Sequence, residues 1–448
     1  MNRPARPPAS TTASTDLAHR SLAAVWHPCT QMKLHEDAPP LAISSGEGPW
    51  LIDADGRRYL DAISSWWVNL FGHGDARIRA AVHAQLDQLE HVMLAGCTHE
   101  PVVRLSERLA ALTGLGHAFY GSDGASATEV ALKMSAHYWR NRGQPDKNSF
   151  IAVTGSYHGE TLGALAVTDI ALFRSTYEPL LRRQSVVPSP DWRLAPAGDD
   201  ALAFARRQAL GLEAYLAEHH RSVAALIIEP LVQCAGGMAM YHTEYLRQAR
   251  ELCTLYGVHL ICDEIAVGFG RTGSLFAHQQ AGIRPDLLCL SKALTGGFLP
   301  LAVTLATEDI FQAFYHHDLR RGFLHSHSYT GNPLACAAAN AVLDHFETRD
   351  VLADNAALAG RLNDAAQTLA QHRRVRNWRH LGMIWAADID GLGASDANAR
   401  FAQAALRHGA LLRPIGATVY WMPPYCLSDS DLQHLADATL AALNEALP

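Results

Sequence analysis

The chain has 448 residues and a formal net charge of −7. It is long enough for two or three domains and lacks the basic balance of a nucleic-acid-binding protein. No uninterrupted apolar stretch is long enough to cross a membrane. The eight cysteines are scattered, with no Cys-x-x-Cys pair, and several lie inside apolar runs. This pattern predicts buried, reduced thiols and a cytoplasmic protein whose partners are neither nucleic acid nor a membrane.

The N-terminal segment is rich in Pro, Ala, Ser and Thr and lacks the apolar core of a signal peptide. We therefore expect residues 1–20 to form a mobile tail. Further along, residues 50–60 alternate apolar and polar side chains around Asp55-Gly56. An Asp-Gly pair in this setting is typical of the turn of a β-hairpin.

From about Asp75 onward, the sequence alternates between amphipathic helices and short apolar runs of strand length. Continuous apolar strands separated by such helices are typical of a mostly parallel sheet that is covered on both faces. A long helical stretch follows Asn332, and α+β character returns near Leu381. The expected helices are residues 78–89, 102–112 and 127–140, and the expected strands are residues 150–153, 224–228, 259–262, 287–290, 301–305, 384–389 and 418–422.

Four of the expected strands end in polar or glycine-bearing segments. In an open α/β sheet, ligands bind beyond the carboxyl ends of the strands. Four such ends that carry aromatic, acidic and amine groups predict the floor of one binding pocket. The four segments are Gly155-Ser156-Tyr157-His158-Gly159, Glu229-Pro230, Asp263-Glu264 and Ser291-Lys292.

Lys292 follows a buried strand and precedes a glycine-rich turn, which places its amine where water is partly excluded. Desolvation disfavours the ammonium form and leaves a nucleophilic amine that can form a Schiff base with an aldehyde cofactor. Asp263, at the end of another strand, offers a carboxylate that can keep a pyridine nitrogen protonated. Together they suggest pyridoxal 5'-phosphate, although each alone is more typical of a surface lysine or of a turn.

The segment 120–129 is a candidate phosphate site, because its glycines precede a helix whose N-terminus can bind an anion. An ordinary capped helix start has the same pattern. The chain has neither a Walker A loop nor an intact Gly-x-Gly-x-x-Gly fingerprint, which disfavours ATP and nicotinamide enzymes. Tyr157 fits either an aromatic face against a cofactor ring or a half-buried core position. His325 and His327 have a poor spacing for joint ligation, so no metal site is predicted.

Seven motifs occur in order along the chain: the Gly124 loop, Tyr157-His158-Gly159, Ile228-Glu229-Pro230, Asp263-Glu264, Gly268-Phe269-Gly270-Arg271-Thr272-Gly273, Ser291-Lys292 and Tyr329-Thr330-Gly331-Asn332-Pro333-Leu334-Ala335. With this set the chain resembles the class III aminotransferases, which are fold-type I pyridoxal-phosphate enzymes, over nearly its whole length. The resemblance implies an α/β fold with two domains. Residues 75–340 would form a large domain with a mostly parallel sheet flanked by helices, and residues 21–74 and 341–448 a smaller α+β domain.

Further stretches narrow the resemblance: Trp26-His27-Pro28, Ser64-Ser65-Trp66-Trp67, residues 232–238, Leu412-Arg413-Pro414 and residues 420–425. They are similar to those of the biotin-synthesis enzymes that transfer an amino group from S-adenosyl-L-methionine to 8-amino-7-oxononanoate. Cys29 stands where these enzymes usually have tyrosine, so lysine, the donor of some relatives, stays open. The remaining alternatives are another class III ω-aminotransferase and a pyridoxal-phosphate-binding regulatory domain. The N-terminal tail is too short to supply the DNA-binding module that the last would need.

The resemblance also implies roles at the cofactor. The residues concerned are Lys292, Asp263, Tyr157, Gly124, Ala125, His327 and Ser328. Lys292 would carry the Schiff base, Asp263 would hold the pyridine nitrogen, and Gly124 and Ala125 would bind phosphate through the backbone. Ser328, where the family usually has threonine, would complete the phosphate site from the neighbouring subunit. The enzyme would then be a homodimer with shared active sites.

A second set of residues is implied at the substrates: Trp66, Trp67, Tyr157, Lys292, Ser326, Arg413 and Tyr420. Arg413 would hold the carboxylate of 8-amino-7-oxononanoate, because a guanidinium fork suits bidentate recognition. Ser326 replaces the glycine that is usual at its position. From the residues alone, a surface ion pair for Arg413 and a core or dimer contact for Trp66-Trp67 would be the simpler interpretations.

Overall fold

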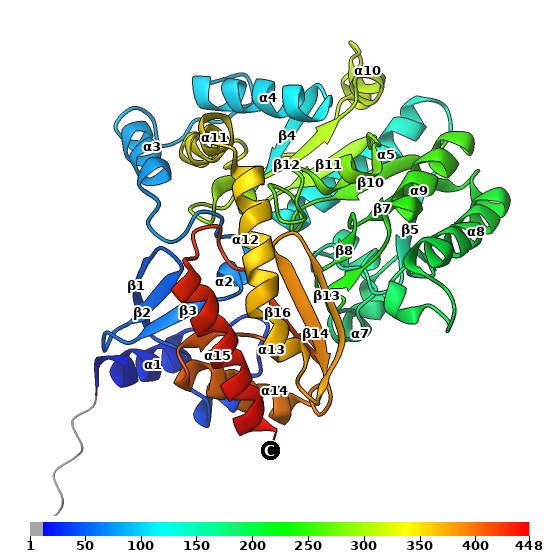
Figure 1. The fold of residues 1–448 in the computed structure, drawn as a ribbon. Helices are drawn as coiled ribbons and strands as arrows, with labels where there is room; N and C mark the ends of the chain where they lie inside the picture. Colours follow the sequence, from blue (N-terminus) through cyan, green and yellow to red (C-terminus); the bar gives the residue numbers. More distant parts are fainter. Residues whose placement is uncertain (1–11, 183, 448) are drawn as a thin grey trace, which may run out of the picture.

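The computed structural model describes residues 12–182 and 184–447, and a seven-stranded sheet runs through the centre of the fold (Figure 1). Its strands are, in spatial order, β4 (His117–Gly121), β12 (Ala302–Ala306), β11 (Leu287–Leu290), β10 (His259–Asp263), β7 (Val223–Ile228), β5 (Ser149–Val153) and β6 (Ser185–Val187). β12 is antiparallel to both neighbours, and the other adjacent strands pair in parallel. The α/β class with a mostly parallel sheet, predicted from the sequence, is therefore confirmed.

Alternate residues of these strands enter apolar layers on the two faces of the sheet. On one face Ile227 and Ile261 join the layer of α5 (Gly124–Asn141) and α10 (Glu308–Phe314), and on the other Leu226 and Leu260 join the larger core. Every residue of β7, β10, β11 and β12 is buried as a result. This double burial is why these strands are continuous apolar runs in the sequence.

The other helices of this part of the chain pack around the sheet (Figure 1). Asp123 begins α5 by accepting a hydrogen bond from the backbone N–H of Ser126 at 2.9 Å, which is an ordinary N-cap. The larger helices are α3 (Ala76–Leu86), α4 (Glu100–Thr113), α8 (Ala201–His219), α9 (Thr243–Leu255) and α11 (Pro333–Thr348). The short elements are α6 (Leu162–Ala166), α7 (Ala171–Arg174), η2 (Ser175–Leu180), η3 (Trp192–Leu194), β8 (Val232–Gln233), β9 (Ala239–Met240), η4 (Ala277–Ala281), η5 (Lys292–Thr295) and η6 (Leu319–Arg321).

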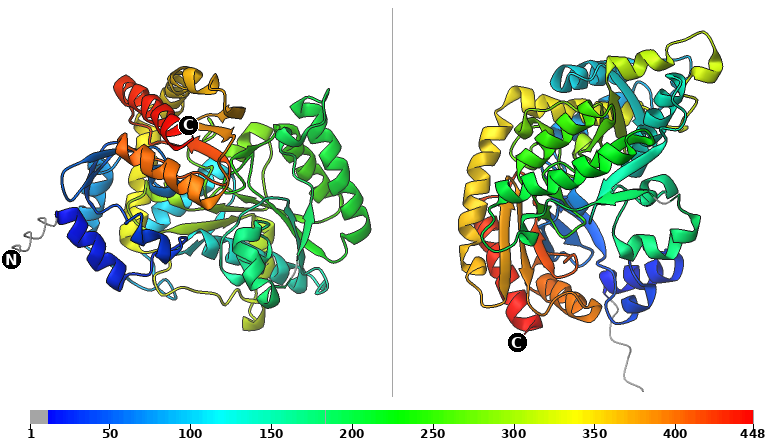
Figure 2. Two further views of the ribbon diagram at one scale, coloured as in Figure 1. Left: turned by 90° about the horizontal axis from the view of Figure 1, so that it is seen from below. Right: turned by 90° about the vertical axis from the view of Figure 1, so that its right-hand side faces the viewer.

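Segments from both ends of the chain lie side by side on one flank of the molecule, where blue meets orange and red in Figure 2. A four-stranded sheet joins β1 (Ile43–Glu47), β2 (Trp50–Asp53) and β3 (Arg58–Asp61) to β15 (Ala410–Leu411). A three-stranded sheet contains β13 (Val375–Leu381), β14 (Ile384–Ile389) and β16 (Thr418–Trp421). The helices here are η1 (Met32–Glu36), α12 (Val351–Ala365), α13 (Gln367–Ala370), α14 (Ser395–Arg407) and α15 (Asp429–Ala446). The domain boundaries themselves stay a prediction.

The predicted hairpin and most predicted elements are present. β2 and β3 pair in antiparallel fashion around Gly56, whose φ of +85° suits a residue without a side chain. The strands expected at residues 287–290 and 384–389 have the predicted bounds. The helix expected at residues 78–89 runs from Ala76 to Leu86 instead, because Asp75 caps its start.

The mobile tail predicted for residues 1–20 is wrong in its second half. Residues 1–11 lie outside the described residues, but Ala13–Ala24 form the helix α1. The side chain of Thr12 caps this helix by accepting a hydrogen bond from the backbone N–H of Thr15. The capping residue belongs to the Ser/Thr-rich segment whose composition had suggested a mobile tail. Across residues 12–182 and 184–447, none of the helices is both long and apolar enough to span a bilayer.

Candidate active site

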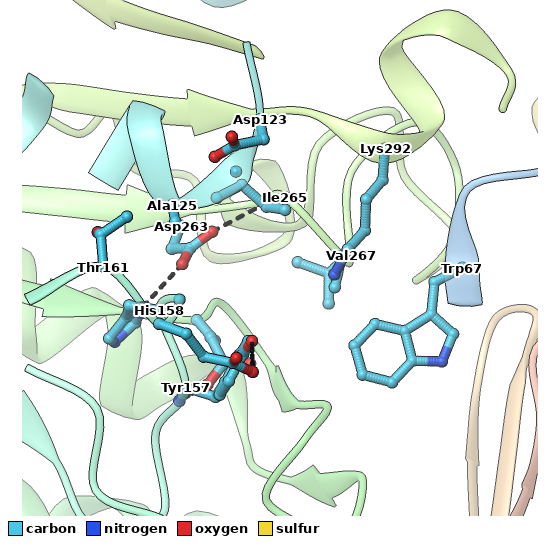
Figure 3. A pocket seen from close by; sticks show the side chains of 15 residues that line it. Trp67, Asp123, Ala125, Tyr157, His158, Thr161, Asp263, Ile265, Val267 and Lys292 are labelled. Atoms are coloured by element: carbon cyan, nitrogen blue, oxygen red, sulfur yellow. Dashed lines mark hydrogen bonds and ion pairs between the residues drawn. The ribbon is translucent and has the colours of Figure 1, made fainter. Parts of the chain in front are cut away.

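A cavity of about 440 Å³ opens at the carboxyl ends of the central strands, and the four polar strand ends meet there (Figure 3). Tyr157 follows β5, Glu229 follows β7, Asp263 ends β10 and Lys292 follows β11. The full lining consists of Trp67, Asp123, Gly124, Ala125, Tyr157, His158, Gly159, Glu160, Thr161, Glu229, Asp263, Ile265, Ala266, Val267 and Lys292. The parallel arrangement of the strands thus brings together residues that are far apart in the sequence.

Lys292 reaches from its turn into this cavity (Figure 3). Its φ is +47°, a left-handed conformation that costs a non-glycine residue roughly 1–2 kcal/mol and that the surrounding structure must stabilise. Its Nζ lies 4.4 Å from the centre of the Trp67 ring. Loss of contact with water lowers the pKa of the Lys292 ammonium, although Cys234, Asp263 and Glu229 act in the opposite direction. The site therefore favours the neutral, nucleophilic amine more than water does.

The tryptophan beside Lys292 belongs to a left-handed turn. All four residues of α2 (Ser64–Trp67) have φ between +46° and +72°. Asp61 holds this turn, because its carboxylate accepts hydrogen bonds from the Ser65 backbone N–H at 2.9 Å and from the Ser65 hydroxyl at 2.7 Å. Such strain is concentrated at functional sites. Here it sets Trp67 toward the cavity, while Trp66 remains 40 % exposed.

Asp263 is fixed by two hydrogen bonds on the cavity floor, both drawn in Figure 3. Its Oδ2 lies 2.7 Å from Nδ1 of His158, and its Oδ1 accepts the backbone N–H of Ile265 at 3.1 Å. His158 is in turn held through its backbone, whose N–H donates to the Thr168 hydroxyl and whose carbonyl accepts from Thr128. The carboxylate of Asp263 is therefore held in one orientation.

Glu229 is a second buried carboxyl group in the cavity wall. Its two oxygens accept the backbone N–H groups of Tyr157 at 2.9 Å and Cys234 at 3.1 Å. Burial, assisted by the charge of Asp263, raises the pKa of Glu229 to about 7. Glu229 therefore changes its charge near neutral pH. Its carboxyl group joins the segment that carries Tyr157 to the segment that carries Cys234.

The raised pKa of Glu229 predicts a pH dependence of stability. Because the pKa of about 7 in the folded protein exceeds the usual value of 4.5, the contribution of Glu229 to the free energy of unfolding is fully present below pH 4.5. This contribution, on the order of 3 kcal/mol, is lost as the pH rises to 7. In the cofactor-free protein, Glu229→Gln should remove this slope from a plot of Tm against pH. Parallel curves for the two proteins would contradict the assignment.

Tyr157 and Glu160 form the polar side of the cavity mouth. The Tyr157 hydroxyl donates to Oε1 of Glu160 at 2.9 Å, and burial together with this carboxylate raises the pKa of the phenol. The Tyr157 ring packs edge-on against Phe173, with ring centres 5.4 Å apart. The phenol is thus held in its protonated form with its ring fixed in the cavity wall.

The N-terminus of α5 closes the opposite end of the cavity. Among the described residues, no acceptor bonds the backbone N–H groups of Gly124 and Ala125, whereas those of Ser126 and Ala127 are bonded to Asp123. A Cβ at Gly124 would come within 2.9 Å of Ile265, and one at Gly159 within 2.6 Å of Ala125. Bare backbone at a helix N-terminus is well suited to a phosphate group.

A larger chamber of about 910 Å³ adjoins this cavity, and Trp67 lines both. Besides Trp67, it contains three residues predicted at the substrates, namely Trp66, Arg413 and Tyr420. The Arg413 guanidinium carbon lies 4.6 Å from the centre of the Trp66 ring, and its Nη2 donates to the Cys29 carbonyl at 2.7 Å. The Trp67 indole N–H donates to the Tyr420 hydroxyl at 3.1 Å. These contacts link the two spaces through aromatic side chains.

Three predicted site residues lie outside both cavities of the single chain. Ser326, His327 and Ser328 lie between η6 and α11, where Nε2 of His327 is 3.2 Å from Nε2 of His325. The phosphate contact predicted for Ser328 was assigned to a neighbouring subunit, and the site roles predicted for Ser326 and His327 stay predictions, since neither residue lines a cavity of the single chain. Within the described residues, no cluster of three or more His, Cys, Asp or Glu side chains has a geometry suited to a metal ion.

Sequence reasoning assigned no role to His158, Glu160, Glu229 or Val267, although all four line the cavity. His158 and Glu229 were expected only as members of motifs and of the strand ends at the pocket floor, without a function of their own. The contact between His158 and Asp263 spans 105 residues of sequence, so no local pattern can reveal it. Glu160 lies two residues before α6, in the connection from β5, and carried no signal beyond its charge.

The residues that line the cavity fit pyridoxal 5'-phosphate. An amine with a lowered pKa, a fixed carboxylate and unbonded N–H groups at a helix N-terminus match an aldehyde, a pyridine nitrogen and a phosphate. This set of groups, at the strand ends of a mostly parallel sheet, is typical of the fold-type I pyridoxal-phosphate enzymes.

The chain belongs to the class III aminotransferases, whose family model matches residues 32–443. It is 42 % identical over 437 residues to the adenosylmethionine-8-amino-7-oxononanoate aminotransferase of Helicobacter pylori, covering 96 % of this chain and 98 % of that one. It is 44 % identical over 434 residues to the enzyme of that name from Synechococcus elongatus, with 94 % and 98 % covered. The resemblance to this family is therefore confirmed, and the chain is an aminotransferase.

Solved structures agree with this assignment. The adenosylmethionine-8-amino-7-oxononanoate aminotransferase of Methanocaldococcus jannaschii superposes with a TM-score of 0.90 at 33 % identity, covering 96 % of this chain and 99 % of that one. The ω-transaminase of Pseudomonas jessenii, in complex with PMP, gives a TM-score of 0.90 at 27 % identity, with 96 % and 98 % covered. The fold is thus common to enzymes with different substrates, and the substrate must be argued separately.

Proposed function

We propose that this aminotransferase transfers an amino group from S-adenosyl-L-methionine to 8-amino-7-oxononanoate in biotin synthesis and gives 7,8-diaminononanoate. The observation that carries the proposal is the identity of 42 % and 44 % to relatives named for these two compounds, over nearly the full length of both chains. The chambered site, with an arginine beside paired tryptophans, supports a substrate that is both long and anionic. We also propose a cytoplasmic homodimer.

In this proposal, Lys292 binds the cofactor and moves the proton. When bound, pyridoxal 5'-phosphate supplies an aldehyde that exchanges amines and a ring that takes up negative charge. The Lys292 amine holds the cofactor at rest and then acts as general base and acid. Asp263 keeps a proton on the ring nitrogen, with its carboxylate held by His158. Donor and acceptor use one site in turn, so ping-pong kinetics are expected.

The phosphate is bound by backbone N–H groups of Gly124 and Ala125 at the start of α5. Ser328 and the adjacent His327 of the neighbouring subunit complete that site, a proposal consistent with the finding that neither lines the cavity of its own chain. Substrates contact two layers of side chains. These are Tyr157 and Trp67 at the inner cavity and Trp66, Tyr420, Arg413 and the neighbouring subunit's loop at Ser326 farther out.

Arg413 binds the carboxylate of 8-amino-7-oxononanoate. Its side chain is exposed in the larger chamber and gives one N–H to a backbone carbonyl, so other donors of the fork remain for the substrate. Replacement of Arg413 with alanine should raise the KM for 8-amino-7-oxononanoate about 10- to 100-fold, which corresponds to a charge-assisted hydrogen bond. The KM for the donor should change much less.

Steady-state kinetics with each substrate varied in turn would measure the change in KM for the acceptor and for the donor separately. Arg400→Ala is a matched control, because Arg400 is an exposed arginine that pairs only with Asp396 on its own helix. Parallel rises of both KM values in the Arg413 variant would contradict the assignment to the acceptor carboxylate.

Product formation tests the proposed reaction directly. Purified protein loaded with pyridoxal 5'-phosphate is given 8-amino-7-oxononanoate with S-adenosyl-L-methionine or lysine as sole donor. Diaminononanoate with S-adenosyl-L-methionine alone would support the proposal and show that Cys29 is tolerated near the donor. Product with lysine alone would keep the acceptor and change the donor. If neither donor gives product, the proposed reaction is wrong.

A second candidate function is a general ω-transaminase, which the superposition on the Pseudomonas jessenii enzyme favours. Turnover of simple amines with the usual keto acids, and none with 8-amino-7-oxononanoate, would support it.

A further inference from the structure

A groove of about 620 Å³ lies between the C-terminal half of α5 and residues 320–325, apart from both chambers of the site. It is lined by six basic side chains and by no aspartate or glutamate. The six are Lys133, His137, Arg140, Arg182, Arg320 and His325. Such a concentration of positive charge stands out in a chain with a net charge of −7.

Most of these cations have no acidic partner. Within the described residues, the Arg140 guanidinium makes neither a hydrogen bond nor an ion pair. Arg182 donates to the Asn148 side-chain oxygen, and Lys133 donates to Nδ1 of His325 at 2.8 Å. Arg320 is the exception, since it pairs with Asp318 at 2.7 Å. Three cations of the groove, Lys133, Arg140 and Arg182, therefore form no ion pair with a carboxylate of the described residues, and the Glu129 carboxylate nearby acts on His325.

The basic side chains come from separate elements that converge. Lys133, His137 and Arg140 lie at positions i, i+4 and i+7 of α5 and so share one face of the helix. Burial, with Arg140 and Lys133 nearby, lowers the pKa of His137, and burial with Lys133 lowers the pKa of His325. The histidines thus respond to the same positive field, which an anion would relieve.

The groove is distinct from the predicted phosphate site of the cofactor. Both lie along α5, but Gly124 begins the helix and Arg140 is sixteen residues further on. At a rise of 1.5 Å per residue, the two are about 24 Å apart along the helix axis. One phosphate group cannot reach both places.

We propose that this groove binds an anion of the diphosphate class. A diphosphate offers several oxygens and at least two negative charges, which can meet the Arg140 and Arg182 forks and the Lys133 ammonium together. A single carboxylate would leave most of the positive charge uncompensated. The diphosphate can be free pyrophosphate or the phosphate chain of a nucleotide, and both present the same chemistry to these side chains.

Titration calorimetry of the protein saturated with pyridoxal 5'-phosphate tests the proposal, because the cofactor keeps added phosphate out of the active site. Inorganic pyrophosphate should bind once per chain and at least about tenfold more weakly when the salt is raised from about 50 to 200 mM. ADP is titrated in parallel. Tighter binding of ADP identifies a nucleotide as the ligand, and equal or weaker binding identifies the diphosphate itself.

The double variant Arg140→Gln, Arg182→Gln should bind pyrophosphate at least tenfold more weakly while keeping its transaminase rate. The control is Arg400→Gln, which removes an exposed arginine on another helix and should bind as the unchanged protein does. Arg140→Lys keeps the charge and loses the fork, so an intermediate loss is expected even if the double variant folds poorly. Absence of saturable binding, or equal binding by all variants, would overturn the proposal.

Discussion

Replacement of Lys292 with alanine is expected to lower turnover at least about 10³-fold, the largest effect of any single substitution in this chain. Lys292 is the amine that lines the floor of the cavity with its pKa lowered by burial. In the proposed mechanism, the variant would lose both the covalent hold on the cofactor and the group that moves the proton. Added small primary amines should restore part of the rate, because they can enter the space that the side chain leaves.

The measurement is steady-state transamination with saturating pyridoxal 5'-phosphate, with and without added methylamine. Lys33→Ala is the control, since Lys33 is an exposed lysine that pairs with Glu36 and does not line the cavity. Circular dichroism at matched temperature would show that the variant is folded. Turnover by the Lys292 variant at the unchanged rate, without added amine, would exclude the mechanism.

The second large effect is expected for Asp263→Asn. The substitution keeps the shape of the side chain but removes the negative charge that would hold a proton on the ring nitrogen. Removal of a preorganised electrostatic group at a reacting centre costs about 10²–10³-fold in rate. The affinity for the cofactor should fall far less, because most of its contacts would be to phosphate and to Lys292.

Comparison with His158→Asn separates the effect of the charge of Asp263 on the rate from the effect of its fixed position. His158 is 2.7 Å from the carboxylate and has no contact with the reacting atoms in this mechanism. Its replacement should lower the rate less and change the pH profile of kcat, because Asp263 keeps its charge but loses its fixed partner. Equal turnover by the unchanged protein and the Asp263 variant, at full cofactor occupancy, would refute the role of Asp263.

Much of the fold follows from local patterns in the sequence. The strands at 223–228, 259–263 and 287–290 are continuous apolar runs because both of their faces are buried. The Asp55-Gly56 hairpin follows from turn chemistry. The helix α1 was missed, because a capping threonine in a Ser/Thr-rich segment has the same composition as a disordered tail.

The antiparallel direction of β12 also had no signal in the sequence. A strand buried on both faces has the same apolar composition whichever way it runs, so its direction depends on the connections and on the neighbours β4 and β11. The pairing of β15 with β3 likewise had no signal in the sequence, since it joins Ala410 to Leu60 across most of the chain. Only long-range packing decides such pairs.

The sequence by itself determined the chemistry of this protein: Lys292 and Asp263 at strand ends, a glycine loop before a helix, and motifs similar to those of the class III aminotransferases. Those features are local, because strand ends and helix starts are set by neighbouring residues. Only the tertiary structure decided which groups surround them. It placed His158 against Asp263 and Trp67 beside Lys292, and it buried Glu229 so that the pKa of this carboxyl is raised. The contacts of His158 with Asp263 and of Trp67 with Lys292 join residues more than 100 positions apart, and burial that changes a pKa exists only once the whole core has formed.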